Sequence, residues 1–441
     1  MADSFPIREC YCPAHFGNSY EAMWPGEMAG YLAEMQHLGF NRYGDWLTTT
    51  DTRNPYTTDH WLLGRELLER KKLAYHAAQQ LGLQLDLMVT ANHVYLDQLQ
   101  TDQLATPGPG FYGQLICPSQ PAARAVILGN YENWFRDFAA AGIRLNSFTA
   151  FAYDYGGCGC DQCRPWILTF ARLMREVHAI GEKYHPGLEP WFCSWWWKPE
   201  EHARFNDWAA TEAPGWLKGM SLHIEYNQTR VKEVAVPAGC RKLAFVHIGY
   251  GDTNAGGDIY SKFGPVVAPQ RIPATLHDLA AQGVTGYQAY SEGVFDDVNK
   301  ALLAGTSLPE YARRYFGSAD GWPAWLAQWG DRRQVDVAAA QTEFDRLAAT
   351  ARPGWRLEQW RAKLKLETLD RQIGNPPEWT PAKLKLVEQC LAEHEHLQRD
   401  VYRLGPLRHI LAWPASGAAW YASWAQQQQA TSRAAELPRE A

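Results

Sequence analysis

The sequence predicts an α/β fold, namely a (β/α)8 TIM barrel followed by a C-terminal helical region. Three observations predict it: short apolar runs alternate with amphipathic stretches from residue 5 to about 300, eight such runs occur, and the strand pattern stops after about residue 300. Strands that alternate with helices pair in parallel through right-handed crossovers, and eight repeats can close a barrel. A doubly wound sheet is the alternative, but no glycine-rich phosphate loop follows the first run.

The order of the elements follows from the periodicity of apolar residues along the chain. The runs predicted as strands are Ile7–Cys12, Asn41–Leu47, Leu83–Thr90, Leu145–Tyr153, Glu189–Trp196, Met220–Glu225, Lys242–Ile248 and Thr285–Tyr290. The main helices predicted between them are Thr58–Leu81, Pro121–Ala141, Arg164–Tyr184, Pro199–Ala210 and Pro269–Gln282. Proline near helix starts and glycine just after helix ends, as at Gly82 and Gly142, mark these boundaries.

Beyond the barrel, the segments 324–350, 355–373 and 381–404 show helical spacing of apolar residues with mixed charge. We therefore expect a barrel domain over residues 1–305 and a helical region over residues 306–425. Residues 426–441 are polar and rich in alanine, and we expect them to be a flexible tail.

Composition excludes several classes of function. The chain has 441 residues, of which 46% are hydrophobic, and its net charge is −6 without a basic run, which argues against a nucleic-acid partner. No apolar stretch reaches the roughly 20 residues that a membrane span needs. The first residues carry no signal segment, so we expect a cytoplasmic protein. We expect no organic cofactor, and the oligomeric state stays open.

Polar and aromatic residues gather where the predicted strands end, which is where parallel barrels carry their active sites. The chain contains 20 Trp, 21 Tyr and 16 Phe, and many stand beside Asp, Asn, His or Arg. Trp195–Trp197 cannot all be core residues, because consecutive strand residues point to opposite faces. The residues that we expect to bind substrate are Arg42, Asp45, Trp46, Asn92, His93, Tyr155, Trp195, His223, Tyr250, Tyr290 and Asp296.

Aromatic rings beside carboxylates suit a carbohydrate substrate, since a sugar has an apolar face that stacks on Trp and hydroxyl groups that bind polar side chains. Glycoside cleavage requires an acid together with a base or nucleophile. We expect Asp154 to be the general acid/base and Glu292 its partner, with Glu225 in reserve. The predicted function is a glycoside hydrolase. Long loops after the third and seventh strands favour exo action on a small glycoside or oligosaccharide.

Two alternatives remain. The barrel could bind carbohydrate without cleaving it, or it could be a metal-dependent enzyme that uses His93, His223 and His247. The second alternative lacks the H-x-H or H-x-x-x-H spacing that metal sites often have.

Cys158, Cys160 and Cys163 form a C-x-C-x-x-C motif directly after the fourth predicted strand. Three thiolates this close can hold a tetrahedral Zn²⁺ when a fourth ligand arrives from elsewhere. We expect Cys117 to be that ligand, and Cys10 or Cys12 is the alternative. A zinc ion held by four thiolates has no open position, so it would be structural.

The cysteine arrangement resembles that of family 42 β-galactosidases, in which four cysteines around the fourth barrel strand hold zinc. The resemblance implies that Cys117, Cys158, Cys160 and Cys163 hold zinc here. Asp154 stands where that family has its catalytic Glu. The chain departs from the family at the seventh strand, where the sequence His247-Ile-Gly-Tyr250 lacks the Glu nucleophile.

A second resemblance covers residues 39–317. The strings GFNRYGDW (39–46), NHVYLD (92–97), YDYGGCGC (153–160), YSEGVFDDVN (290–299) and EYARRYFG (310–317) are similar to those of a group of largely uncharacterised bacterial glycosidase-like barrels. That group is related in architecture to hexosaminidases and α-glucuronidases. Hexosaminidases place Asp and Glu side by side after the fourth strand, whereas this chain has Asp154-Tyr155.

Overall fold

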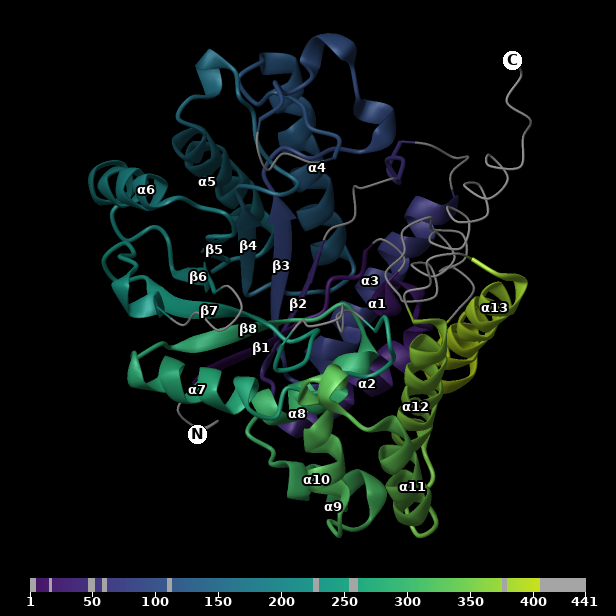
Figure 1. Ribbon diagram of the computed structural model, residues 1–441. Coiled ribbons are helices and arrows are strands. Elements are labelled where there is room, and N and C mark those ends of the chain that lie inside the picture. Colours follow the sequence, from purple (N-terminus) through teal and green to yellow (C-terminus); the bar gives the residue numbers. More distant parts are fainter. Residues whose placement is uncertain are drawn as a thin grey trace, which may run out of the picture. The chain divides into compact units, whose positions relative to one another are not determined.

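The protein contains a closed barrel of eight parallel strands in sequence order, which confirms the predicted TIM-barrel fold (Figure 1). The computed structural model describes residues 5–15, 18–46, 52–57, 62–108, 113–224, 230–253, 261–374 and 379–404. The strands are β1 (Ile7–Tyr11), β2 (Arg42–Trp46), β3 (Gln84–Thr90), β4 (Ser147–Phe151), β5 (Glu189–Cys193), β6 (Gly219–His223), β7 (Arg241–His247) and β8 (Gly286–Tyr290). Each strand overlaps the apolar run that predicts it.

The chain divides into two compact units. The first unit consists of Met1–His15, Pro25–His247 and Thr275–Tyr290 and contains every barrel strand. Its main helices are α2 (Pro25–Leu38), α3 (Leu62–Gln80), α4 (Pro121–Ala140), α5 (Trp166–Tyr184) and α6 (Pro199–Glu212). The helix α2 was not predicted. On the outside of the barrel, α2 packs against α3, and α5 packs against both α4 and α6.

The barrel interior has a polar layer near the amino ends of the strands. Arg42, which is 2% exposed, pairs with Glu9 at 2.9 Å and with Asp86 at 2.7 Å. Gln288 donates to the same Glu9 carboxylate at 3.1 Å. Burial, and then the nearby Asp86 charge, raise the pKa of Glu9 to about 8. One guanidinium lies between two buried carboxyl groups, so hydrogen bonds and the ion pair with Asp86 hold this layer together.

An apolar layer lies further along the strands and closes the barrel beneath the strand ends. It contains six buried side chains from six strands, namely Tyr11, Trp46, Met88, Phe151, Cys193 and Phe245. Large rings fill this layer, so the barrel interior is closed by packed side chains just before the carboxyl ends of the strands.

The second unit consists of Phe16–Trp24, Ile248–Ala274 and Ser291–Ala441. Its helices are α1 (Ser19–Ala22), α8 (Asp297–Leu303), α9 (Leu308–Phe316), α10 (Trp322–Ala327), α11 (Val337–Ala348), α12 (Trp355–Ile373) and α13 (Pro381–His396), while α7 (Arg271–Ala281) crosses from this unit into the first. Ser307 and Glu310 form a capping box that begins α9, and Gly317 at φ 88° ends it.

Helices alone follow β8 in the described part of the chain, as predicted. The predicted helix 324–350 is in fact two helices, α10 and α11, with 3-10 turns around Gly330 between them. The expected boundary at residue 305 stays a prediction, and the expected tail 426–441 lies outside the described residues. No helix in the described ranges is long and apolar enough to span a membrane.

Candidate functional site

Aromatic rings and histidines form a connected belt at the carboxyl ends of β5 to β8. The Trp195 ring, two residues after β5, lies 4.2 Å from the His223 ring and 5.2 Å from the His247 ring, measured between centroids. The His247 ring lies 5.1 Å from Tyr290, the last residue of β8. Burial lowers the pKa of His223 to about 4, so this imidazole is neutral at pH 7. These three predicted site residues, Trp195, His223 and Tyr290, therefore lie in one place.

The belt continues over β2 to β4. Tyr155, which follows β4, lies edge-on to Trp46 at 5.8 Å and to His93 at 5.5 Å between ring centroids. A Cβ atom on Gly113 would lie 2.5 Å from His93 and 2.8 Å from Tyr155, so only glycine lets this loop approach. Burial lowers the pKa of His93 to about 3. The predicted residues Trp46, His93 and Tyr155 thus also come together.

Asp154 lies three residues after β4 and is partly buried. Burial raises the pKa of this carboxyl to about 6. Among the described residues, no cation pairs with it. A carboxylic acid with a pKa near 6 is about half protonated at pH 6 and about one tenth protonated at pH 7, far more than an ordinary aspartic acid, so it can serve as a general acid.

Two strained residues occupy matching positions in neighbouring loops. β4 and β5 pair in parallel with Phe151 opposite Cys193. Three residues beyond each of these, Asp154 and Trp196 both adopt the left-handed conformation, with φ values of 75° and 60°. That conformation is tolerated by Asp but is unusual for a bulky residue such as Trp. Backbone strain of this kind collects at functional sites.

Three predicted substrate-binding residues have internal partners. Arg42 was expected to lie beyond the end of the second strand. It is instead the first residue of β2 and lies within the polar layer. Asp45 is 1% exposed and accepts hydrogen bonds from Lys71 at 3.0 Å and from the Ala14 backbone at 2.8 Å. Asn92 is fully buried, and its side chain joins the loop after β4 to the segment near residue 116. A structural role accounts for the polarity of all three.

Tyr250, Glu292 and Asp296 belong to the second unit. The carboxylate of Glu292 accepts a hydrogen bond from Asn18 at 3.0 Å. Asp296 is fully buried and forms an ion pair with Lys300.

Lys300 also holds the segment that carries Glu292. Its ammonium group donates to Tyr20 at 2.8 Å, to Ser291 at 2.9 Å and to the Gly293 carbonyl at 2.8 Å. Glu292 therefore stands between two anchored neighbours. Glu225, the reserve carboxylate, lies outside the described residues.

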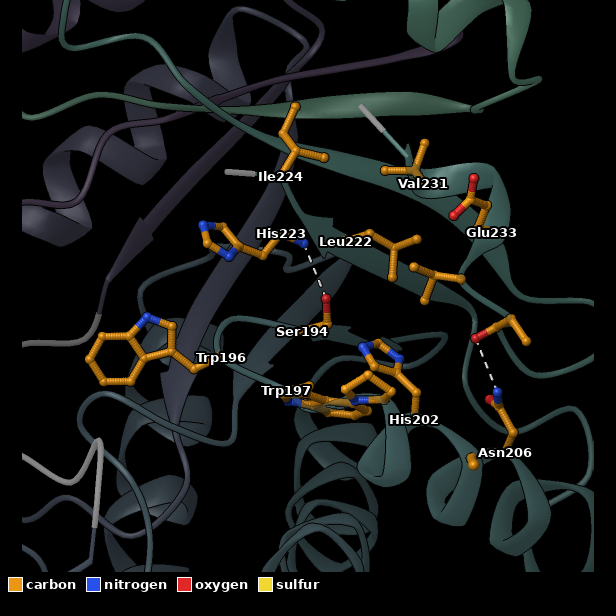
Figure 2. Close-up of a pocket in the computed structure, with 14 residues that line it drawn as sticks. Ser194, Trp196, Trp197, His202, Asn206, Leu222, His223, Ile224, Val231 and Glu233 are labelled. Atoms are coloured by element: carbon orange, nitrogen blue, oxygen red, sulfur yellow. Dashed lines mark hydrogen bonds between the residues drawn. The ribbon is translucent and has the colours of Figure 1, made fainter. Parts of the chain in front are cut away.

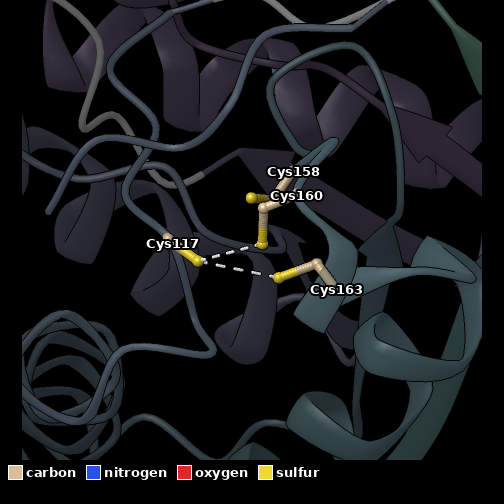
Figure 3. A group of neighbouring side chains, drawn as sticks. All are labelled: Cys117, Cys158, Cys160 and Cys163. Carbon is tan, nitrogen blue, oxygen red and sulfur yellow. Dashed lines mark hydrogen bonds between the residues drawn. The ribbon is translucent and has the colours of Figure 1, made fainter.

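The four predicted cysteines form one cluster (Figure 3). Their sulfur atoms all lie within 4.8 Å of one another, and Cys117 Sγ lies 3.8 Å from Cys160 and 3.7 Å from Cys163. A tetrahedral zinc with Zn–S bonds of about 2.3 Å separates its sulfur ligands by about 3.8 Å. The donor set and its spacing therefore fit a metal ion of this kind.

Neither alternative fourth ligand belongs to the cluster: Cys10 donates to the Arg42 carbonyl at 3.3 Å, and Cys12 is not a member. Nor do His93, His223 and His247 form a second group of metal-binding side chains within the described ranges. The histidine-based metal enzyme therefore has no support in this part of the chain.

A cavity of about 730 Å³ opens beside the belt (Figure 2). It is bounded by the segment after β5, by α6, by the end of β6 and by the 3-10 helix η5 (Arg230–Glu233). Trp196, Trp197, His202 and Asn206 line it, and none of them was predicted as a site residue. The spacing of His202 and Asn206 on one face of a predicted helix was the available signal.

Comparison with known proteins supports the fold. No protein-family profile and no curated protein matches the chain. Among solved structures, a GH138 enzyme targeting pectin rhamnogalacturonan II is similar with a TM-score of 0.54 and 10% identity, over 97% of this chain and 67% of that one. The Thermobaculum terrenum O-GlcNAc hydrolase gives a TM-score of 0.47 at 13% identity, over 96% and 94% of the two chains. The likeness to the GH138 enzyme shows the fold alone. The chain thus has a TIM-barrel fold, which also occurs in that enzyme.

Proposed function

We propose that the protein is a glycoside hydrolase in which Asp154 is the general acid. The observation that carries the proposal is a carboxyl group with a pKa raised by burial, held in a left-handed conformation beside a belt of aromatic and neutral histidine side chains. Rings and hydrogen-bonding groups without strong charge suit the apolar face and hydroxyl rim of a sugar. The barrel fold is compatible with this chemistry but does not carry the proposal.

In the proposed reaction, Asp154 donates its proton to the glycosidic oxygen as the bond to the anomeric carbon breaks. Glu292, two residues after β8, is the proposed partner that activates water or attacks the anomeric carbon, and water supplies the new hydroxyl group. Glu225 is the reserve for this role. The proposed action is exo, on a small glycoside or oligosaccharide, and the long loops after the third and seventh strands support it.

We further propose that the cysteine cluster binds one structural Zn²⁺. Four thiolates would complete a tetrahedral shell and leave no position for substrate, so the ion would stabilise the loop and take no part in catalysis. Cys158–Cys163 follow Asp154 within the same loop, and Cys117 lies on a separate segment. The ion would therefore fix the loop that carries the general acid.

Substitution of the two carboxylates tests the proposal. We expect Asp154→Asn and Glu292→Gln each to lower kcat/KM on a cleavable glycoside by about 10²–10⁴-fold. The substrate is first identified by screening a panel of aryl glycosides and neutral oligosaccharides. Chromatography then detects the products. Full turnover by both variants would refute the assignment. Sugar binding without any product after prolonged incubation would instead favour a barrel that only binds carbohydrate.

A further inference from the structure

The cavity beside β5 and β6 is separate from Asp154, which does not line it, but it shares His223 with the aromatic belt. One wall is a single face of α6, where His202 and Asn206 stand four residues apart (Figure 2). Its volume of about 730 Å³ lies within the range of roughly 300–1,000 Å³ found for small-molecule sites.

Three residues that line this cavity carry buried polar atoms without a hydrogen-bond partner in the described structure. Trp197 is 8% exposed, and its Nε1 hydrogen has no acceptor. His202 Nδ1 and Asn206 Oδ1 are buried atoms that also lack a hydrogen-bond partner, although the Asn206 amide group donates to the Ala235 carbonyl at 3.0 Å. Buried polar atoms in folded proteins are normally satisfied, so these three residues have hydrogen-bonding capacity that a ligand in the cavity can use once their side chains turn toward it.

The charge of the lining restricts what that ligand can be. Burial lowers the pKa of both His202 and His223 to about 4, so both rings are neutral at pH 7. No Lys or Arg side chain lines the cavity in the described ranges, and its one carboxylate, Glu233, is exposed. Among the described residues of the lining, an anionic ligand would find no cation, whereas an uncharged ligand rich in hydroxyl groups would find hydrogen-bonding side chains.

An aromatic platform connects the cavity to the belt. Trp196 is 42% exposed and stacks on Trp195 with a centroid distance of 6.0 Å and an interplanar angle of 23°. Trp195 in turn contacts His223, which lines the cavity. A large exposed indole in a strained conformation is costly for a structural residue, but it is suited to stacking against a sugar face.

We propose that this cavity is a second saccharide subsite, which binds an uncharged sugar unit joined to the unit that is cleaved beside Asp154. The inference rests on the proposed function and extends it to a substrate class, namely neutral oligosaccharides of at least two units. Trp196 provides the stacking surface, and Trp197, His202 and Asn206 bind the hydroxyl groups.

The test compares Trp196→Ala and Asn206→Ala with the wild type and with Trp24→Ala, a control at another exposed tryptophan. For each variant, kcat/KM is measured on a neutral oligosaccharide and on an aryl monoglycoside of the same terminal sugar. We expect the ratio of the two values to fall at least tenfold in Trp196→Ala and Asn206→Ala and to stay within twofold in Trp24→Ala. Circular dichroism confirms that every variant is folded.

A second measurement separates the subsite from the proposed function. Calorimetry on Asp154→Asn compares binding of the neutral oligosaccharide with binding of a uronic-acid oligosaccharide of equal length. The subsite proposal is wrong if the ratio of the two kcat/KM values is unchanged in both Trp196→Ala and Asn206→Ala. It is also wrong if the uronic-acid oligosaccharide binds more tightly than the neutral one. Either result would hold even if Asp154 proves essential. If the wild type cleaves nothing but binds the neutral oligosaccharide with an affinity that Trp196→Ala abolishes, the hydrolase proposal fails and the subsite stands.

Discussion

Asp154 combines a perturbed carboxyl group with an unusual backbone conformation. Its carboxyl pKa is raised by burial, and its backbone is left-handed. A Glu at this position would suffer the full steric cost of that conformation, which Asp and Asn avoid better than other side chains. The backbone therefore favours the shorter acid at this position.

The first prediction concerns the pH dependence of catalysis. The general acid must be protonated in the free enzyme, and burial raises the pKa of Asp154 to about 6. We therefore expect kcat/KM to fall about tenfold per pH unit above pH 6. Initial rates on a substrate with a poor leaving group, measured from pH 4 to pH 9, provide the profile. With a leaving group that needs no protonation, the decrease in kcat/KM above pH 6 should disappear. If the decrease persists with that substrate, a different group titrates.

The second prediction concerns the cost of this carboxyl to folding. Its pKa is about 6 in the folded protein and about 3.9 in an unfolded chain, so its contribution to stability falls as pH rises from 4 through 6. We expect Asp154→Asn to raise the free energy of unfolding at pH 7 by about 1–3 kcal/mol. Urea unfolding at pH 7 and at pH 4 checks it. The gain should disappear at pH 4, and an equal gain at both values would contradict the electrostatic cause.

At the scale of elements, the loop after β4 is anchored at several points. Asn92 bonds the Gly157 backbone in both directions, and the cysteine cluster holds the loop from residue 158 onward. These anchors lie on the C-terminal side of Asp154, so the loop has little freedom to move the carboxyl.

The third prediction tests the metal. Cys163→Ser removes one of four thiolates, so we expect the purified protein to lose about one equivalent of zinc and to unfold at a lower temperature. Cys240→Ser is the matched control, because Cys240 is a free thiol outside the cluster. Metal content by mass spectrometry and the Tm by calorimetry are the measurements. Equal zinc content in both variants would show that the cluster does not hold the ion.

The elements were predictable to different degrees. Strands such as Glu189–Cys193 are short apolar runs bounded by breakers, and the cysteine motif is local in sequence, so both could be read from the chain. The roles of Arg42 and Asp45 could not be predicted from the sequence, because their partners Glu9 and Lys71 come from other elements. The cavity was missed for the same reason: the segment after β5, α6, β6 and η5 build it together, and a single segment carries just the spacing of His202 and Asn206.

For the whole molecule, the buried charges of the polar layer link stability to pH. Glu9 is fully buried between Arg42 and Gln288, and its pKa of about 8 lies well above the value of about 4.3 for an unfolded chain. The folded state thus holds a proton that the unfolded state releases. This group's contribution to stability falls as pH rises from about 4.5 through 8.

The fourth prediction follows from that proton. Glu9→Gln keeps the shape of the side chain but cannot titrate, so the loss of stability between pH 6 and pH 9 should be smaller than in the wild type. The slope due to one proton is at most about 1.4 kcal/mol per pH unit. Chemical denaturation across this range provides the slope, with the exposed Glu66→Gln as control. Parallel curves for wild type and Glu9→Gln would assign the slope to other groups.

The two compact units are interleaved along the chain. The polypeptide passes from one to the other at five peptide bonds, after His15, Trp24, His247, Ala274 and Tyr290. No single cut in the gene therefore yields either unit complete. Recombination that exchanges one contiguous fragment would give each product an unfinished unit, so we expect this barrel and its helices to be inherited and engineered as one piece.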